Sequence, residues 1–477
     1  MEGSVETLSR ALGCLAVVGL LGVALVLATS PASFFSPDHQ TGSVLAKVPQ
    51  GNSADLGRGC AAGGNPASIA YEYFTVDTTA VRGAITSGAP VSIRFKATNF
   101  TVVLGAYALV SAGALVKIDH GNSTETKAAP SLAAIGSVVG TPNSTAIVTL
   151  TGNYFDGIVQ FGTNWYFDSN VPGGPVGGSL HRGWNITVDA SVHTGQVGDT
   201  PPSCGDGPNG IPPGPTLRAV PVVPSAAGTR GDGGPRPLQI RQQSLLISGD
   251  AEYYNLFWWC PPFLHIPQDV CETAQMTTEV ALLNFIYNGI QGLGVRTPEV
   301  NFNIVGFDIH TPAGNGGMTS FDTLTLVRQY RDHTLAAHGT PDYHAAHLLT
   351  GKDLNGDVGG YGGLNTENPS DPDQHAHWSV AQMVGAAGTV YDASNYGRML
   401  LNSHEVGHTY TAMHNFALHF RVCWWIFCSD YYTIMWSVYN GDSAMLARFS
   451  DSVTDNRPPA QSNRDLIHAE SLVKPLR

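Results

Sequence analysis

Charged residues are scarce in this chain of 477 residues, because only 13% of them are Asp, Glu, Lys or Arg. Lys and Arg number 24 against 37 Asp and Glu, so the formal net charge is -13. Without a basic patch to neutralise phosphates, the composition argues against nucleic acid as a partner. Glycine (55 residues) and proline (30 residues) are abundant instead. This balance is typical of a loop-rich, strand-rich extracellular protein rather than a helical cytosolic one.

Long hydrophobic runs are also lacking, except for the 18 residues Ala11–Ala28. The length of this run lies between that of a signal-peptide core and that of a membrane span. The small residues Ser30 and Ala32 would suit a signal peptidase. We therefore predict that residues 1–32 are either a cleaved signal peptide or an N-terminal transmembrane anchor through residues 11–28. In both cases we expect a secreted or cell-surface protein.

Cysteine is sparse, with six residues outside the leader, and none of their spacings is that of a zinc knuckle. An even number of cysteines in an exported chain indicates disulfides, although the sequence cannot fix their pairing. The close pairs Cys260/Cys271 and Cys423/Cys428 are the natural candidates. Acceptor sites for N-glycosylation also suit an exported segment. They lie at Asn99, Asn122, Asn143 and Asn185.

The most informative segment of the chain is LNSHEVGHTYTAMH, residues 401–414. His404 and His408 are four residues apart, so both imidazoles lie on one face of a helix and can bind one metal ion. His414 can complete a three-nitrogen zinc site whose fourth position stays open, as in catalytic zinc sites. Glu405 can then act as general base and acid on zinc-bound water. The segment predicts one catalytic Zn²⁺ ion and a hydrolase, and we favour a protease.

The chain before this segment contains two regions that differ in composition. Short apolar–polar alternations over residues 68–192 predict strands, so we expect a β-rich propeptide-like or accessory domain over 33–195. Residues 196–242 are crowded with Pro and Gly and predict an exposed linker. Three arginines make that linker a candidate for proteolytic processing: Arg230, Arg236 and Arg241.

From residue 243 the pattern alternates between strand and helix, and it predicts an α/β (α+β) domain with a mixed, mostly parallel sheet. We place this domain at 243–455 and a polar C-terminal tail at 456–477. The expected strands are 245–248, 300–309, 347–350 and 377–380. The expected helices are 273–292, 321–335 and 396–411, the last of which carries the metal motif.

The segment His404–His414 resembles the long zinc motif of the metzincin metalloproteases, and its flanks are similar to the adamalysin/reprolysin branch of that family. Ser437 stands where astacin-type and serralysin-type metzincins carry tyrosine, which favours the reprolysin comparison. Residues 130–170 resemble the propeptide of the same family. Further resembling segments are His344–Lys352 before the edge strand, Gly359–Leu364 in it, Tyr432–Trp436 at the Met-turn and Arg448–Ser450 at the domain end.

The resemblance implies a metzincin-like catalytic domain in which Met435 supports the zinc site from below. It also implies that substrate lies extended along the edge strand and that residues 437–440 wall a specificity pocket. The family carries glycine at the position of Thr411 and aspartate at that of Asn415. A β-branched threonine is poorly suited to positive φ, so either this turn is built differently or His414 is displaced.

Latency is a second prediction. The segment around Cys204 (PPSCGD) resembles the cysteine switch of metzincin zymogens, in which a propeptide thiolate occupies the open zinc position. A disulfide between Cys60 and Cys204, or a free thiol in the linker, are the alternatives.

Together these features predict an exported zinc endopeptidase that acts on protein or peptide substrates. Two other functions remain open on the sequence. The chain could be a catalytically silent cell-surface binding protein on a metzincin scaffold, or a zinc amidohydrolase that is not a peptidase.

Overall fold

The fold comes from a computed structural model, and the residues that the structure describes are the following. They are 72–95, 98–129, 132–152, 154–162, 164–170, 180–187, 196–197, 240–257, 267–289, 296–338, 342–355, 359–363, 377–383, 395–424, 427–435, 446 and 448–474. The predicted leader, Cys60, Cys204, Cys260 and most of the predicted linker lie outside these residues. Within the described part of the chain, no helix combines the length and apolar character needed to cross a membrane.

An antiparallel sheet fills the amino-terminal part, in the order β1-β10-β9-β8-β7-β6-β3-β2. Its inner face is apolar because alternate residues such as Ile93, Val102 and Val148 are buried together. The β-rich character predicted for this part is therefore present. Its strands are β1 (Glu72–Thr75), β2 (Val91–Phe95), β3 (Thr98–Tyr107), β6 (Leu132–Val138), β7 (Thr145–Thr151), β8 (Tyr154–Phe161), β9 (Asn164–Asn170) and β10 (Leu180–Thr187).

Helix α2 (Thr78–Ser87) covers this sheet and was not predicted. The Asp77 side chain caps it by accepting a hydrogen bond from the Ala80 backbone N–H. Gly88 ends it in the left-handed conformation, with φ +69°.

A second sheet has mixed direction and the order β15-β16-β14-β12-β13-β4-β5. Neighbouring strands from β16 to β4 run parallel, and only the outermost strands β15 and β5 are antiparallel to their neighbours. The predicted mixed, mostly parallel sheet is confirmed. Its strands are β4 (Val110–Asp119), β5 (Thr124–Ala128), β12 (Arg241–Gly249), β13 (Val300–His310), β14 (Ala345–Thr350), β15 (Gly360–Gly362) and β16 (Trp378–Gln382).

The hairpin β4–β5 belongs to the amino-terminal part of the chain but extends the second sheet. β4 pairs parallel with β13, so that Val116 lies opposite Phe307 and Ile118 opposite Ile309. All four side chains are buried in one core. The two sequence regions on either side of the predicted linker therefore share a sheet and a core, which composition alone did not indicate.

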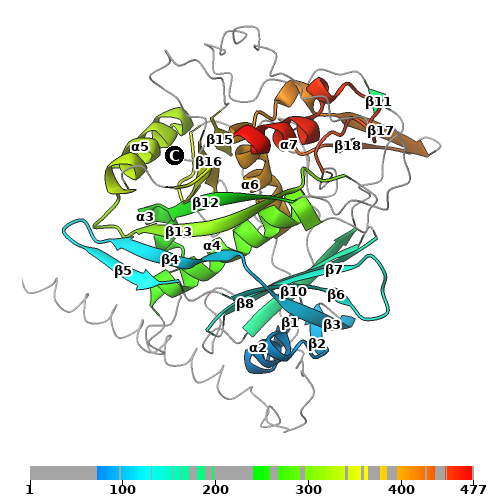
Figure 1. Cartoon of the computed structure of the whole chain (residues 1–477), viewed down its shortest axis with the longest axis horizontal. Coiled ribbons are helices and arrows are strands. Elements are labelled where there is room, and N and C mark those ends of the chain that lie inside the picture. The colour runs from blue at the N-terminus through cyan, green and yellow to red at the C-terminus, as the bar shows by residue number, and fades with distance from the viewer. Residues whose placement is uncertain are drawn as a thin grey trace, which may run out of the picture.

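Helices cover both faces of the second sheet. Figure 1 shows α4 (Gln268–Asn284) and α5 (Thr323–His338) on opposite sides of β12 and β13, with α4 facing the amino-terminal sheet. A π-helical turn (Phe285–Gly289) continues α4, and the pair corresponds to the helix predicted at 273–292. Helix α6 (Asn395–Thr409) packs beside α4 and under β15 and β16. The short helix α3 (Ala251–Asn255) follows β12.

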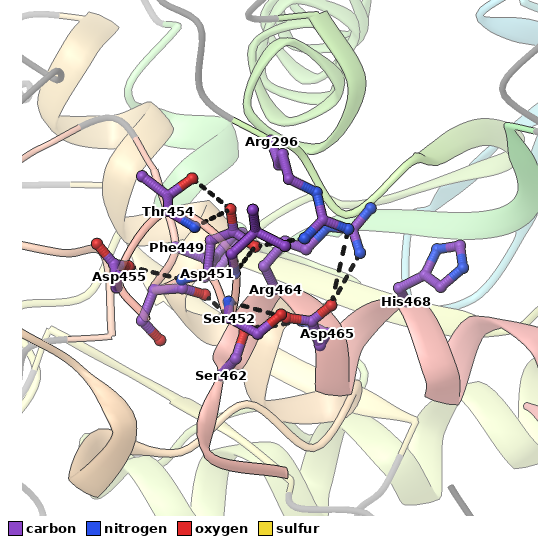
Figure 2. Close-up of polar contacts among 12 residues, drawn as sticks. Arg296, Phe449, Asp451, Ser452, Thr454, Asp455, Ser462, Arg464, Asp465 and His468 are labelled. Carbon is purple, nitrogen blue, oxygen red and sulfur yellow. Dashed lines mark hydrogen bonds and ion pairs between the residues drawn. The ribbon is translucent and has the colours of Figure 1, made fainter. Parts of the chain in front are cut away.

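The carboxyl end is ordered rather than a plain polar tail. A 3₁₀ turn (Pro459–Gln461) leads into α7 (Asn463–Val473), whose Ile467 is fully buried. Figure 2 shows the polar contacts at the start of this helix. The Ser462 side chain accepts a hydrogen bond from the Asp465 N–H, the Asp465 carboxylate accepts one from the Ser452 N–H, and Arg296 pairs with Asp451.

Candidate metal centre

The helix α6 places His404 and His408 one turn apart on the same face, as the spacing predicted. It ends at Thr409, two residues earlier than expected. The Ala412 N–H then donates to the Gly407 carbonyl at 3.0 Å, and the Thr411 N–H donates to the His408 carbonyl at 3.0 Å. This pair of bonds is a Schellman motif, which needs a left-handed residue at its turn.

Thr411 supplies that residue, with φ +64°. The turn is therefore built in the way a glycine would build it, and His414 is not displaced. The sequence predicted either a differently built turn or a displaced His414. Both alternatives are wrong, because Thr411 adopts the unfavourable left-handed backbone conformation. A short 3₁₀ turn (His414–Phe416) follows and presents the His414 ring to the helix.

Three ring nitrogens converge at one point. The Nε2 atoms of His404 and His414 are 2.9 Å apart, those of His408 and His414 3.0 Å, and those of His404 and His408 3.2 Å. Donors that hold one zinc ion at about 2.0–2.1 Å in tetrahedral directions lie about 3.4 Å from each other. The three distances are close to this value, so the ring positions fit a single small cation.

The protonation of the rings supports the same conclusion. His404 Nδ1 donates to the Ile434 carbonyl at 2.7 Å, and His408 Nδ1 donates to the Ala412 carbonyl at 2.8 Å. Because a carbonyl can only accept, these two Nδ1 atoms carry the protons, and the Nε2 atoms of both neutral rings present lone pairs. Two lone pairs that face each other at 3.2 Å repel, and a cation between them removes the repulsion.

Burial favours the neutral form of all three histidines. Burial, strengthened by the neighbouring His414, lowers the pKa of His404 to about 3. Burial also lowers the pKa of His414 to about 4, and it lowers the pKa of His408 well below its usual value. Neutral imidazoles are the form that binds metal. At neutral pH the site therefore offers three unprotonated donors.

Glu405 lies beside the first histidine and is only 5% exposed. Burial raises the pKa of its carboxyl well above the usual range, since the charged form loses its hydration. The edge strand β15 packs directly on this part of α6. A Cβ added to Gly360 would lie 2.7 Å from the Glu405 Cγ, and one added to Gly362 would lie 2.1 Å from the Glu405 carbonyl oxygen. Only glycine allows this approach.

Met435 lies in the core beneath the helix and is fully buried. A Cβ added to Gly407 would meet the Met435 Sδ at 3.1 Å, so the thioether packs against the α6 backbone between the two histidines of the helix. The preceding residue, Ile434, provides the carbonyl that orients His404. The segment predicted as a Met-turn therefore contacts the site through both a side chain and a backbone oxygen.

Two sets of contacts that orient the site were missed by the sequence reasoning. The Asn463 side chain at the start of α7 donates to the Met413 carbonyl at 3.0 Å and accepts from the Met413 N–H at 2.7 Å. It thereby fixes the residue directly before His414. A capping pattern, Ser462 followed by Asp465, marks this helix start and was available in the sequence.

The second set lies behind α6. Asn402 donates to the Glu279 carboxylate at 2.9 Å, and its Oδ1 is 3.0 Å from His347 Nε2. Glu279 also accepts from Arg398 at 2.7 Å. These buried groups tie α6 to α4 and β14. No local spacing in the sequence signals them, because the partners are far apart along the chain.

The structure describes some of the remaining predicted residues, namely cysteines of the two predicted pairs and Asn415, and leaves others outside the described residues. β17 (His419–Trp424) and β18 (Phe427–Tyr432) pair so that Cys423 lies opposite Cys428, which is the register a disulfide between them needs. Cys271 is disulfide-bonded. Asn415 is exposed. The predicted pocket wall 437–440 and the predicted switch residue Cys204 lie outside the described residues.

Comparisons with known proteins add little to this geometry. No family model matches the chain, and no curated protein matches it. Among solved structures, metalloproteinase-II from Bacteroides fragilis is similar, with 10% identity over 70% of this chain and 85% of that chain. The TM-score is 0.33, which is too low to carry an argument about fold or activity.

Proposed function

We propose that this chain is a zinc-dependent endopeptidase of the metzincin type, and that the adamalysin/reprolysin branch is the best comparison for it. The observation that carries the proposal is the convergence of the three Nε2 atoms of His404, His408 and His414 within 3.2 Å of each other. Three neutral imidazoles with a buried carboxylate beside them are the donor set of a catalytic zinc site. Such an ion would be held by these three side chains.

Zinc in this position would supply a Lewis acid that polarises a carbonyl and makes hydroxide available near neutral pH. Glu405 would accept a proton from the attacking water at its carboxylate and later deliver it to the nitrogen of the leaving amine. The carbonyls of Ile434 and Ala412 hold the ring protons of the two helix histidines, so that both Nε2 atoms stay aimed at the cation.

The edge of the second sheet supports a peptide as substrate. Among the described strands, β15 pairs only with β16, and one of its faces packs on α6 at Glu405. An extended peptide can add to such an edge through backbone hydrogen bonds. This arrangement would bring a scissile bond to the three histidines without requiring particular side chains.

The test compares wild type with Glu405→Gln and Glu405→Ala on casein, each after proteolytic cleavage in the predicted linker 196–242, with and without a chelator. We expect one catalytic zinc per chain in all three proteins and hydrolysis by the wild type alone, lost when the chelator is added. Loss of the base should lower kcat by about 10²–10⁴-fold. Glu125→Gln, which changes an exposed carboxylate, is the control. Equal turnover by wild type and Glu405→Gln would remove this glutamate from the mechanism.

The same proteins separate the other two functions. Bound zinc without cleavage of any protein or peptide would favour a silent binding protein. Hydrolysis of small acetylated amides without cleavage of peptides would favour an amidohydrolase. The intact Glu405 favours the peptidase, because a scaffold that only binds has no use for this carboxylate.

Latency through Cys204 is part of the proposal. The short strand β11 (Gln196–Val197) pairs with β17, with Val197 opposite His419. Cys204 follows Val197 by seven residues and can therefore reach about 24 Å from it. His419 is five residues from His414, so the metal centre lies within that reach. Cys204→Ser should be active without processing, whereas a Cys60–Cys204 disulfide would leave no thiol to label.

Export to the cell surface or the medium completes the proposal. Three of the predicted glycosylation residues that the structure describes are exposed: Asn99, Asn122 and Asn143. Glycans on these residues in the native protein, detected by mass spectrometry after glycosidase treatment, would show passage through a secretory compartment.

A further inference from the structure

A second group of metal-binding side chains lies away from the three histidines of α6. Asp308 and His310 are two residues apart near the end of β13, so they point to the same face of the sheet. Helix α5 covers this face and contributes His333. The three-histidine site lies on the other face, where α6 packs with α4.

The ligand atoms of this second group converge. The Asp308 Oδ2 atom is 3.4 Å from His310 Nε2 and 3.5 Å from His333 Nε2, and all three ligand atoms lie within 4.8 Å of one another. The two imidazole rings meet edge to face, with centroids 4.4 Å apart. Donors that share one tetrahedral zinc ion are about 3.4 Å apart. Both distances to Asp308 Oδ2 match this spacing.

The orientation of His310 has the features of a metal ligand. This residue is fully buried, and its Nδ1 donates to the Gly314 carbonyl at 3.0 Å. The proton is then on Nδ1, and the Nε2 lone pair points toward Asp308 and His333. Within the described part of the chain, neither His310 Nε2 nor His333 Nε2 has a hydrogen-bond partner. Each nitrogen instead faces the Asp308 carboxylate at 3.4 or 3.5 Å, a separation that a bound cation would bridge.

The loop 311–319 closes over the group and depends on glycine where it meets His333. Gly316 has φ +57°, and a Cβ there would lie 2.6 Å from His333 Nδ1. The next residue, Gly317, has φ +77° and no atom within 4 Å of an added Cβ. The backbone therefore needs both glycines, but only Gly316 is in contact with the histidine ring.

We propose that Asp308, His310 and His333 form a second metal site, which binds a divalent transition-metal ion such as Zn²⁺ and fastens α5 and the loop 311–319 to the end of β13. Two imidazoles and one carboxylate favour such an ion over Ca²⁺ or Mg²⁺, which prefer oxygen ligands. This ion would have no part in catalysis, and its site does not depend on the peptidase proposed above.

A metal-free charged cluster is the rival explanation. In it, protonated His310 or His333 would donate to Asp308. Such a charge-assisted bond closes to about 2.7–2.9 Å. Both distances to Asp308 are longer than this and nearly equal, as expected for donors arranged around an ion.

The experiment measures zinc per chain in the full-length protein after dialysis, by plasma mass spectrometry. We expect two zinc ions in wild type, one in His408→Ala, one in His333→Ala and none in the double variant. His120→Ala is the control, because His120 forms an exposed pair with Glu125 at 3.6 Å and should leave both ions bound. If His333→Ala retains as much zinc as wild type while His408→Ala loses one ion, the second site is refuted.

A pair of variants that removes no ligand atom tests the same proposal. Gly316→Ala and Gly317→Ala impose similar backbone strain, but only the first pushes against His333. In the His408→Ala background we expect Gly316→Ala to weaken zinc binding at least tenfold relative to Gly317→Ala, by calorimetric titration of metal-free protein. Equal affinities in the two variants would overturn the assignment of His333 as a ligand. If wild type binds only the second ion, the peptidase proposal fails and this one stands.

Discussion

The left-handed Thr411 gives a sharp test of how the third histidine is positioned. A residue other than glycine in this conformation costs about 1–2 kcal/mol. Glycine avoids that cost but loses about 0.5–1 kcal/mol through the greater freedom of the unfolded chain. We therefore expect Thr411→Gly to be more stable than Thr411→Ala by roughly 0.5–1 kcal/mol, although alanine is the better residue almost everywhere else in and around a helix.

The assay is the thermal unfolding of metal-free protein at pH 7.5, followed by circular dichroism for wild type and both variants. A difference of this size shifts the midpoint by about 2 °C. Zinc content should be unchanged in Thr411→Gly, because the contacts of Asn463 with Met413 still hold the segment before His414. A glycine variant less stable than the alanine variant would refute the left-handed turn and reopen the position of His414.

Three further predictions concern the sheet edge, pH and the Met-turn. Gly362→Ala should lower peptidase activity in the casein assay at least tenfold, because its Cβ would lie 2.1 Å from a backbone oxygen of α6. Gly359→Ala is the control and should retain that activity, because no atom would lie nearer than 3.4 Å to its Cβ. Burial lowers the pKa of His347 to about 4, so this histidine binds a proton at a higher pH in the unfolded state than in the folded state. The free energy of unfolding should therefore fall as the pH drops from 6.5 toward 4. The slope from this residue is at most about 1.4 kcal/mol per pH unit, and urea unfolding of His347→Gln should show a shallower dependence than wild type. Met435→Ala should destabilise metal-free protein by about 2–5 kcal/mol through the cavity it leaves, and an unchanged urea midpoint would contradict the packing described here.

The metal motif was predictable because its geometry is local. His404 and His408 are one helical turn apart, and His414 follows after a single tight turn, so spacing alone brings the rings together. The conformation of Thr411 was not predictable in the same way. Residue preference argued against positive φ, but the hydrogen bonds that close the Schellman motif outweigh that preference.

The contacts that orient the site were not predictable, because they join distant segments. The Ile434 carbonyl and the Asn463 side chain are brought to the histidines by the fold and not by a motif. Likewise, His310 and His333 lie on a strand and a helix with no recognisable spacing between them. Strand patterns also reveal that a segment is extended but not which neighbour it pairs with. The sequence therefore predicted the strand-rich amino-terminal part without indicating that β4 joins the other sheet.

Because β4 pairs with β13, cleavage of the linker and release of the amino-terminal fragment are two separate events. A cut anywhere in residues 198–239 would sever the polypeptide but leave the backbone ladder between β4 and β13 in place. The amino-terminal fragment would remain attached to the rest of the protein, held by that ladder and by the buried side chains around Val116 and Ile118. Its dissociation would leave β13 as a bare edge, open to self-association. Such a cut should therefore yield a nicked two-chain particle, and the free carboxyl-terminal fragment should be prone to aggregate.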